Sequence, residues 1–175
     1  MKESLKERLY RKLDDQAKVF AWASNKKYSS IFRLSVVLKE SIDANLLQEA
    51  VKLALEKFQA FKVKMKKGVF SYYFIGNELE PVVKPEKNSL FRKVNTKENN
   101  KYLFRTTYVE NRINMEFFHA LTDGNGASKF LKEVIYRYLE LKHPKNLEMV
   151  KLEESEIIYE SENAYIKNYK KNVKK

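Results

Sequence analysis

The sequence of 175 residues contains no cysteine. The chain can therefore form neither disulfide bonds nor a zinc site with thiolate ligands, and its cysteine usage leaves the redox compartment open. It also has no run of about 18 consecutive apolar residues, the length that a membrane-spanning helix needs. Residues 1–8 are charged and lack the apolar centre of a signal peptide. From these absences we expect a protein of the cytoplasm without a membrane span.

Histidine is scarce as well, because His119 and His143 are the only two in the chain. The acidic residues near them do not show the spacing of a metal site, so we expect no metal. His143 stands beside Pro144 and is interpreted as a residue that caps a helix or lies on the surface.

Acidic residues are outnumbered by basic ones, 23 against 35, which gives a formal net charge of +12. Such a charge attracts an anionic partner, which would be a nucleic acid, a membrane surface or a phosphate-bearing cofactor. Much of the excess lies in residues 62–67 and 167–175, and runs of this kind are most simply solvated faces or a frayed end. No nucleic-acid motif is present, so we expect no specific nucleic-acid partner.

What the chain does contain is enough apolar material for a core, with 43% hydrophobic and 13% aromatic residues. Apolar residues recur at helical spacing in three segments. The first runs from Leu5 to Phe20, the second from Leu46 to Phe58 with Asp43 as its N-cap, and the third from Ala127 to Leu141, ended by Pro144. The spacing therefore predicts three helices.

Residues with high β-propensity form the other segments. A strand is predicted over residues 28–39, one hairpin over 61–67 and 69–75, and another over 102–109 and 112–119. The second hairpin places Ile113, Met115 and Phe117 on the same face as His119. Residues 77–100 are interpreted as a loop, with the pattern of a short edge strand near 90–94, and 157–169 have a weak helical pattern. The order of elements indicates an α+β fold, a mixed sheet with helices packed on it.

The candidate reactive residues lie at the junction between the last strand and the last helix, where the sequence is Phe118-His-Ala-Leu-Thr-Asp-Gly-Asn-Gly126. A histidine at a strand end can act as a base near neutral pH. Asp123 would cap the helix or hold a basic residue, while Gly124 and Gly126 would allow a sharp turn. The simpler alternatives are that His119 is a packed or solvent-exposed residue and that Asp123 is only an N-cap.

This segment resembles the His-x-x-x-Asp-Gly signature of the superfamily that includes chloramphenicol acetyltransferase, the condensation domains of nonribosomal peptide synthetases and the alcohol acetyltransferases. Residues 102–105 and 112–118 precede the motif and the helix 127–141 follows it, as in that superfamily. The run from Phe117 to Gly124, together with residues 35–43, is most similar to the alcohol acetyltransferases of Gram-positive bacteria. The resemblance covers roughly residues 5–145.

The resemblance implies a chloramphenicol acetyltransferase-like fold and a two-lobed enzyme with a channel between its lobes. Its donor would be acetyl-CoA or another acyl-CoA, and its acceptor a small alcohol or amine. His119 would deprotonate the acceptor, Asp123 would hold the loop by pairing with a basic residue, and Gly124 would let the backbone approach the substrate closely. No residues that bind the cofactor are identified.

The sequence departs from the superfamily pattern in two respects. Phe118 occupies the position where many members have a second histidine, and the Asp-Phe-Gly-Trp-Gly-like motif of the C-terminal lobe is absent, with Trp22 the only tryptophan. We therefore expect residues 1–145 to form the N-terminal lobe alone and 146–175 to form a polar, partly helical segment. Such a lobe needs a C-terminal lobe or self-association to complete its channel. The alternative is a catalytically incomplete lobe that serves as a binding or oligomerisation module.

Overall fold

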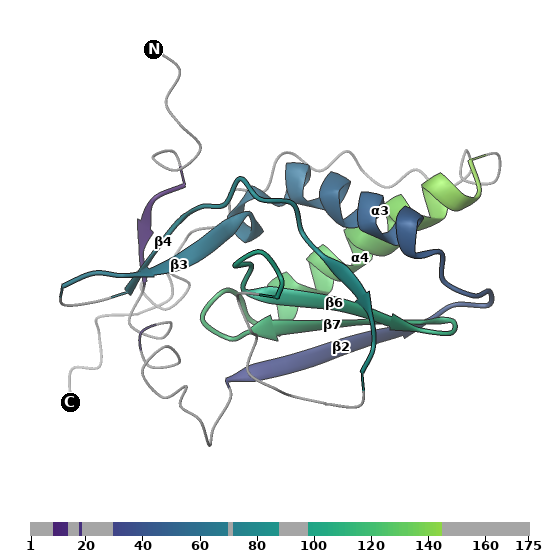
Figure 1. Ribbon diagram of the computed structural model, residues 1–175, viewed down its shortest axis with the longest axis horizontal. Helices are drawn as coiled ribbons and strands as arrows, with labels where there is room; N and C mark the ends of the chain where they lie inside the picture. Colours follow the sequence, from purple (N-terminus) through teal and green to yellow (C-terminus); the bar gives the residue numbers. More distant parts are fainter. Residues whose placement is uncertain (1–8, 14–17, 19–29, 70–71, 88–97, 145–175) are drawn as a thin grey trace, which may run out of the picture.

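The computed structural model describes residues 9–13, 18, 30–69, 72–87 and 98–144 (Figure 1). The expected helical pattern at 157–169, the C-terminal segment 146–175 and the expected edge strand at 90–94 lie outside these residues. The elements, in chain order, are β1 (Arg11–Lys12), β2 (Ile31–Val37), α3 (Ala44–Lys57), the 3₁₀ turn η1 (Gln59–Phe61), β3 (Val63–Lys67), β4 (Tyr72–Gly76), β5 (Val83–Pro85), β6 (Phe104–Val109), β7 (Arg112–Phe118) and α4 (Gly124–Lys142).

The larger sheet has four strands in the order β2-β7-β6-β5. Strands β6 and β7 form the expected hairpin, joined by Glu110 and Asn111, and Glu110 adopts a positive φ of 51° at the turn. Strand β2 pairs antiparallel with β7 over its whole length, whereas β5 pairs parallel with β6. The sheet is therefore mixed, and with its helices it gives the α+β class expected from the sequence.

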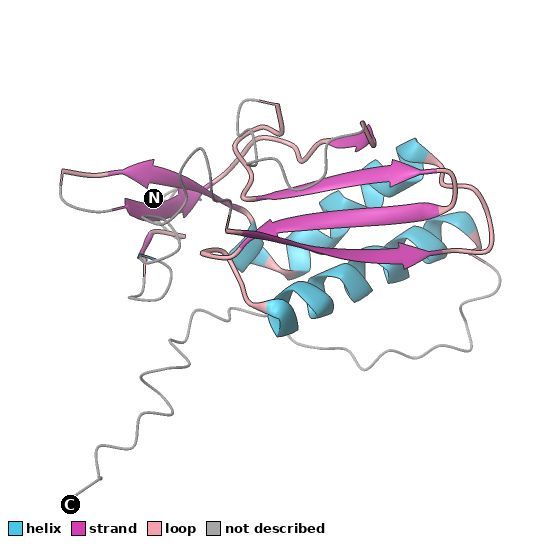
Figure 2. Ribbon diagram, turned by 90° about the horizontal axis from the view of Figure 1, so that it is seen from below, coloured by secondary structure: helices cyan, strands magenta, loops and turns pink. Residues whose placement is uncertain are grey.

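Helices α3 and α4 lie side by side on one face of this sheet (Figures 1 and 2). The Asp43 carboxylate accepts hydrogen bonds from the backbone N–H groups of Asn45 and Leu46, which confirms it as the N-cap of α3. Between the helices and the sheet lies an aromatic core in which the rings of Phe61 and Phe130 stack with their centroids 4.4 Å apart. Phe117, near the end of β7, contacts both of these rings edge-on, so the end of the strand is packed into the core.

A smaller sheet, in the order β1-β4-β3, contains the other expected hairpin, β3 and β4. The helix expected over residues 5–20 is wrong at residues 9–13, because Arg11 and Lys12 form strand β1 and pair with Phe74 and Tyr73 of β4. Leu13, one of the leucines spaced as in a helix, is buried in the core at 3% exposure. Strand pairing thus overrides the local pattern.

Strand β5 was not expected, because residues 77–100 read as a loop. It is only three residues long and contains Pro85, so it carries no alternating pattern that a sequence can reveal. Its position at the edge of the sheet accommodates the proline.

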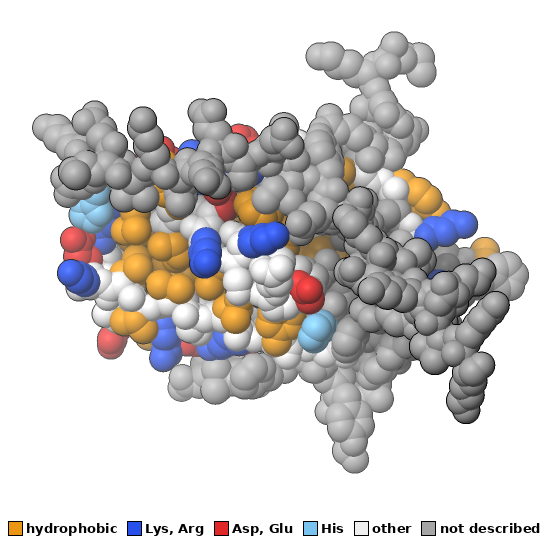
Figure 3. All heavy atoms as spheres, turned by 180° about the vertical axis from the view of Figure 1, so that it is seen from behind, with side chains coloured by type: hydrophobic (Ala, Val, Ile, Leu, Met, Phe, Trp, Pro, Cys, Tyr) orange, Lys and Arg blue, Asp and Glu red, His pale blue; other side chains and the backbone are white. Residues whose placement is uncertain are grey.

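Among the described residues, no helix is long and apolar enough to cross a membrane. Viewed from behind in Figure 3, part of the surface gathers hydrophobic side chains, with lysine, arginine and acidic side chains around them.

Candidate active site

Strands β2 and β7 place His119 at the end of the larger sheet. The residue follows directly after β7, and its backbone N–H donates to the carbonyl of Ser30 over 2.8 Å, which continues the β2–β7 ladder by one step. Next to it, the N–H of Leu121 donates to the carbonyl of Phe118 over 2.8 Å and closes a tight turn. The backbone of His119 is therefore fixed on both sides.

The imidazole of His119 lies on the side of the sheet that the helices cover. Its ring contacts that of Phe32, with centroids 4.9 Å apart and planes inclined by 53°. His119 is partly exposed, whereas Phe118, Ala120 and Leu121 are buried. This turn thus presents the partly exposed imidazole of His119 from the end of a hydrogen-bonded strand.

Asp123 begins helix α4 as its N-cap, with one carboxylate oxygen accepting from the N–H of Gly126 over 2.8 Å. In the part of the chain that the structure describes, Asp123 forms no ion pair, so the basic partner implied by the resemblance is not among its contacts. The helix begins three residues earlier than the apolar pattern indicated, because the cap lies at Asp123. His119 therefore stands four residues before the cap of a 19-residue helix.

The two glycines of the motif have different surroundings. A Cβ atom built on Gly124 has nothing within 4 Å, whereas one on Gly126 would lie 2.3 Å from Oγ1 of Thr122. A side chain at 126 would therefore displace the Thr122 hydroxyl, whereas the space around Gly124 is open.

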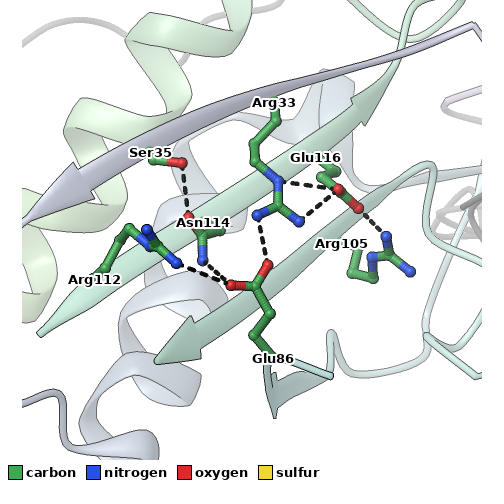
Figure 4. Close-up of polar contacts among 7 residues, drawn as sticks. All are labelled: Arg33, Ser35, Glu86, Arg105, Arg112, Asn114 and Glu116. Carbon is green, nitrogen blue, oxygen red and sulfur yellow. Dashed lines mark hydrogen bonds and ion pairs between the residues drawn. The ribbon is translucent and has the colours of Figure 1, made fainter. Parts of the chain in front are cut away.

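A polar network that the sequence analysis did not identify covers the opposite face of the sheet (Figure 4). Glu116 of β7 is 1% exposed and lies between two arginines: Arg33 of β2 donates to it from Nη2 over 2.7 Å, and Arg105 of β6 contacts its other oxygen. The strand register explains this arrangement, because Arg33 and Arg105 are the two cross-strand partners of Glu116.

Glu86, which follows β5, joins the same network. It contacts Arg33, accepts from Nη2 of Arg112 over 3.3 Å and accepts from Nδ2 of Asn114 over 3.1 Å. Burial alone would lower the pKa of Arg33, but its hydrogen bonds to Glu116 and Glu86 outweigh that effect and raise the pKa above its ordinary value. These contacts link β2, β7 and β6 to the residue that follows β5, on the face of the sheet opposite the helices.

In the sequence, the only indication of this network is that charged residues occur within the β-rich segments. Partners such as Arg33 and Glu116 are 83 residues apart, and only the register of the sheet shows that they face each other. Among the described residues, no three of the side chains that usually bind metals lie together as a metal site would require.

No protein-family model matches the chain, and no curated protein matches it. Several solved structures match it. The starter condensation domain of the rhizomide synthetase RzmA superposes with a TM-score of 0.57 at 14% identity, over 76% of this chain and 38% of that one. Polyketide synthase associated protein 5 from Mycobacterium tuberculosis gives a TM-score of 0.54 at 16% identity, over 75% of this chain and 33% of that one.

Over about three quarters of its length, the chain shares the fold of one part of a condensation domain. The tallysomycin biosynthesis protein TlmII has the same architecture, with a TM-score of 0.54 at 12% identity, over 74% of this chain and 36% of that one. The chain spans little more than a third of the length of these structures. The expectation of a chloramphenicol acetyltransferase-like α+β lobe is therefore confirmed at the level of the fold.

One of the structures with this condensation-domain fold carries a ligand. A variant of the RzmA starter condensation domain was crystallised in complex with C8-CoA, and it superposes with a TM-score of 0.56 over 71% of this chain. That fold therefore accommodates an acyl-CoA in at least one protein.

Proposed function

We propose that this chain is a lobe of a CoA-dependent acyltransferase in which His119 is the general base. The observation that carries the proposal is a partly exposed histidine fixed at the end of a buried strand, within a condensation-domain fold. The histidine stands where the His-x-x-x-Asp-Gly pattern of the sequence requires a base.

In the proposed reaction, an imidazole nitrogen of His119 takes the proton from the hydroxyl or amine of the acceptor. The acceptor oxygen or nitrogen attacks the thioester carbonyl, the carbon–sulfur bond breaks, and the thiolate of CoA receives the proton that His119 holds. The products are an ester or amide and free CoA. No step requires a metal or an external oxidant.

The donor that we propose is acetyl-CoA or another acyl-CoA, and the acceptor is a small alcohol, which makes the chain an alcohol O-acetyltransferase lobe of the cytoplasm. The C8-CoA complex of a protein with the same fold supports an acyl-CoA donor. The motif residues support the alcohol acetyltransferase branch, since the run from Phe117 to Gly124 is the part most similar to it.

Asp123 and Gly124 have supporting roles in this proposal. Asp123 holds the loop by capping α4. Gly124, whose surroundings are open, leaves room for the substrate beside the backbone. A C-terminal lobe or a second copy of the chain completes the channel, because the structures with this fold are much longer.

The release of free CoA tests the proposal. The full chain would be mixed with acetyl-CoA or octanoyl-CoA and a panel of alcohols and amines, over a wide range of protein concentrations. Because the protein contains no cysteine, a thiol reagent detects CoA alone. We expect release that depends on the acceptor and disappears in His119→Ala.

The matched control is His143→Ala, which removes the other histidine and leaves the motif intact. It should release CoA at the rate of the unmodified protein. Equal release by His119→Ala and His143→Ala at every protein concentration would contradict the proposal, and would leave a lobe that acts as a binding or oligomerisation module.

A further inference from the structure

One surface of the smaller sheet carries lysine and tyrosine side chains and is here called the basic hairpin face (Tyr10, Lys12, Lys66, Lys67 and Tyr73). Lys12 and Lys66 are both cross-strand partners of Tyr73, so the three side chains form one row across β1, β4 and β3. The ring of Tyr10 lies 5.4 Å from that of Tyr73. Three strands thus contribute cationic and amphipathic side chains to one face.

Lysines are concentrated in the described β3–β4 hairpin. Residues 62–76 contain four lysines and neither aspartate nor glutamate, and residues 9–13 add Arg11 and Lys12. Within the described part of the chain, the exposed Lys12, Lys66 and Lys67 form no ion pair. The helices differ, because Lys57 and Lys142 are paired with Glu133 and Glu40. Lys12, Lys66 and Lys67 therefore concentrate anions at the hairpin.

The tip of the hairpin is apolar. Val69 is 89% exposed, more than any other large hydrophobic side chain of the described residues, and it follows Lys66, Lys67 and Gly68 directly. Figures 1 and 2 show the β3–β4 hairpin extending from the body of the molecule, away from the end of the larger sheet where β6 turns into β7. A protruding hairpin with an exposed valine at its tip and lysines next to that valine can contact a flat surface of a binding partner.

We propose that the basic hairpin face and Val69 dock the protein on a lipid bilayer with anionic headgroups. The lysines lie against the headgroup phosphates and carboxylates, and Val69 enters the boundary between headgroups and acyl chains. Tyr10 and Tyr73 suit the same depth, because each has an apolar ring and a polar hydroxyl. This docking is independent of acyl transfer.

Two features favour a bilayer over a nucleic acid. The charge of the exposed surface is carried by lysines, whereas arginine is the residue enriched where phosphates are recognised in a fixed geometry. An exposed valine at the tip of the hairpin gains nothing from a sugar–phosphate backbone, but it gains free energy on leaving water for the bilayer boundary.

The test measures binding of the full chain to sedimented vesicles. Binding to vesicles of phosphatidylcholine that contain phosphatidylserine is compared with binding to vesicles of phosphatidylcholine alone. Binding to a single-stranded RNA oligonucleotide in solution is measured separately. We expect binding to the anionic vesicles only. The double variant Lys66→Gln/Lys67→Gln should bind them about 25-fold more weakly, since each lysine near an anionic surface contributes about fivefold.

The matched control is Lys39→Gln/Lys132→Gln, which removes the same charge from exposed positions outside the hairpin and should bind like the unmodified protein. Val69→Ser should weaken vesicle binding several-fold at unchanged net charge. All variants should keep the circular dichroism spectrum of the unmodified protein, because the altered side chains are exposed.

Equal vesicle binding by the hairpin and control variants would overturn the proposal, as would equal binding to vesicles with and without phosphatidylserine. Tighter binding to RNA than to vesicles, unaffected by Val69→Ser, would assign the face to nucleic acid instead.

Discussion

At the scale of single residues, the two glycines of the motif differ in what a methyl group would meet. Gly124→Ala should leave the free energy of unfolding unchanged or raise it, since alanine in a helix is favoured over glycine by up to about 1 kcal/mol. In Gly126→Ala the new Cβ would lie 2.3 Å from Thr122 Oγ1, and a rotation of Thr122 away from its preferred rotamer costs about 1 kcal/mol. The urea midpoint of unfolding should therefore be lower for Gly126→Ala than for Gly124→Ala. Equal midpoints would show that the turn accommodates the methyl group without cost.

Glu116 provides a second test at this scale. It is buried between Arg33 and Arg105, so Glu116→Gln removes the charge that both guanidinium groups face. Loss of one partner of a buried ion pair costs about 3 kcal/mol or more, because the remaining charges stay desolvated. The control Glu49→Gln removes a carboxylate that is 48% exposed and paired with Lys52, which should cost at most about 1 kcal/mol. Similar urea midpoints for the two variants would mean that the network adds little.

The residues of the site could be predicted from the sequence only where they are close together along the chain. His119, Asp123 and the glycines occupy eight consecutive positions, and local β-propensity and capping rules place them at a strand end and a helix start. The partners of Glu116 come from two other strands, so their contact depends on a register that no local pattern contains.

At the scale of elements, the same distinction separates the segments that were predicted from those that were not. Helix α3 has both a regular apolar face and an aspartate N-cap, and its prediction is confirmed. Strands β1 and β5 are two and three residues long, and each forms by pairing with a strand far away in the sequence. Helical spacing of the leucines near residue 9 does not distinguish a helix from this strand, because Leu13 is buried directly after β1.

The C-terminal end of α4 is tied to the segment before α3 by a contact that should respond to pH. A hydrogen bond from Lys142 lowers the pKa of Glu40 below its ordinary value of 4.5, and the charge of a protonated His143 acts in the same direction. A lowered carboxylate pKa adds stability above the ordinary value, which is lost as the pH falls through the folded-state pKa.

Unfolding by urea at a series of pH values checks this contact. The stability difference between the unmodified protein and Glu40→Gln should be present at neutral pH and should shrink as the pH falls below 4.5. The contact would contribute nothing measurable if the two midpoints stayed together at every pH.

At the scale of the whole molecule, the described residues place His119 at the end of the larger sheet. The structures with this condensation-domain fold are longer, and this chain spans 33% to 38% of those compared above. In the proposed function, the rate of CoA release should consequently rise more steeply than in proportion to protein concentration if two copies share a channel. A rate strictly proportional to concentration would indicate that a single copy suffices.

The most direct test of the central claim is the amount of ester formed from an acyl-CoA and an alcohol, measured by mass spectrometry for the unmodified protein, His119→Ala and His143→Ala. A general base contributes about 10² to 10⁴-fold to a rate. The account predicts that His119→Ala forms ester more slowly by such a factor while His143→Ala is unaffected. Ester formed at the same rate by all three proteins would contradict it.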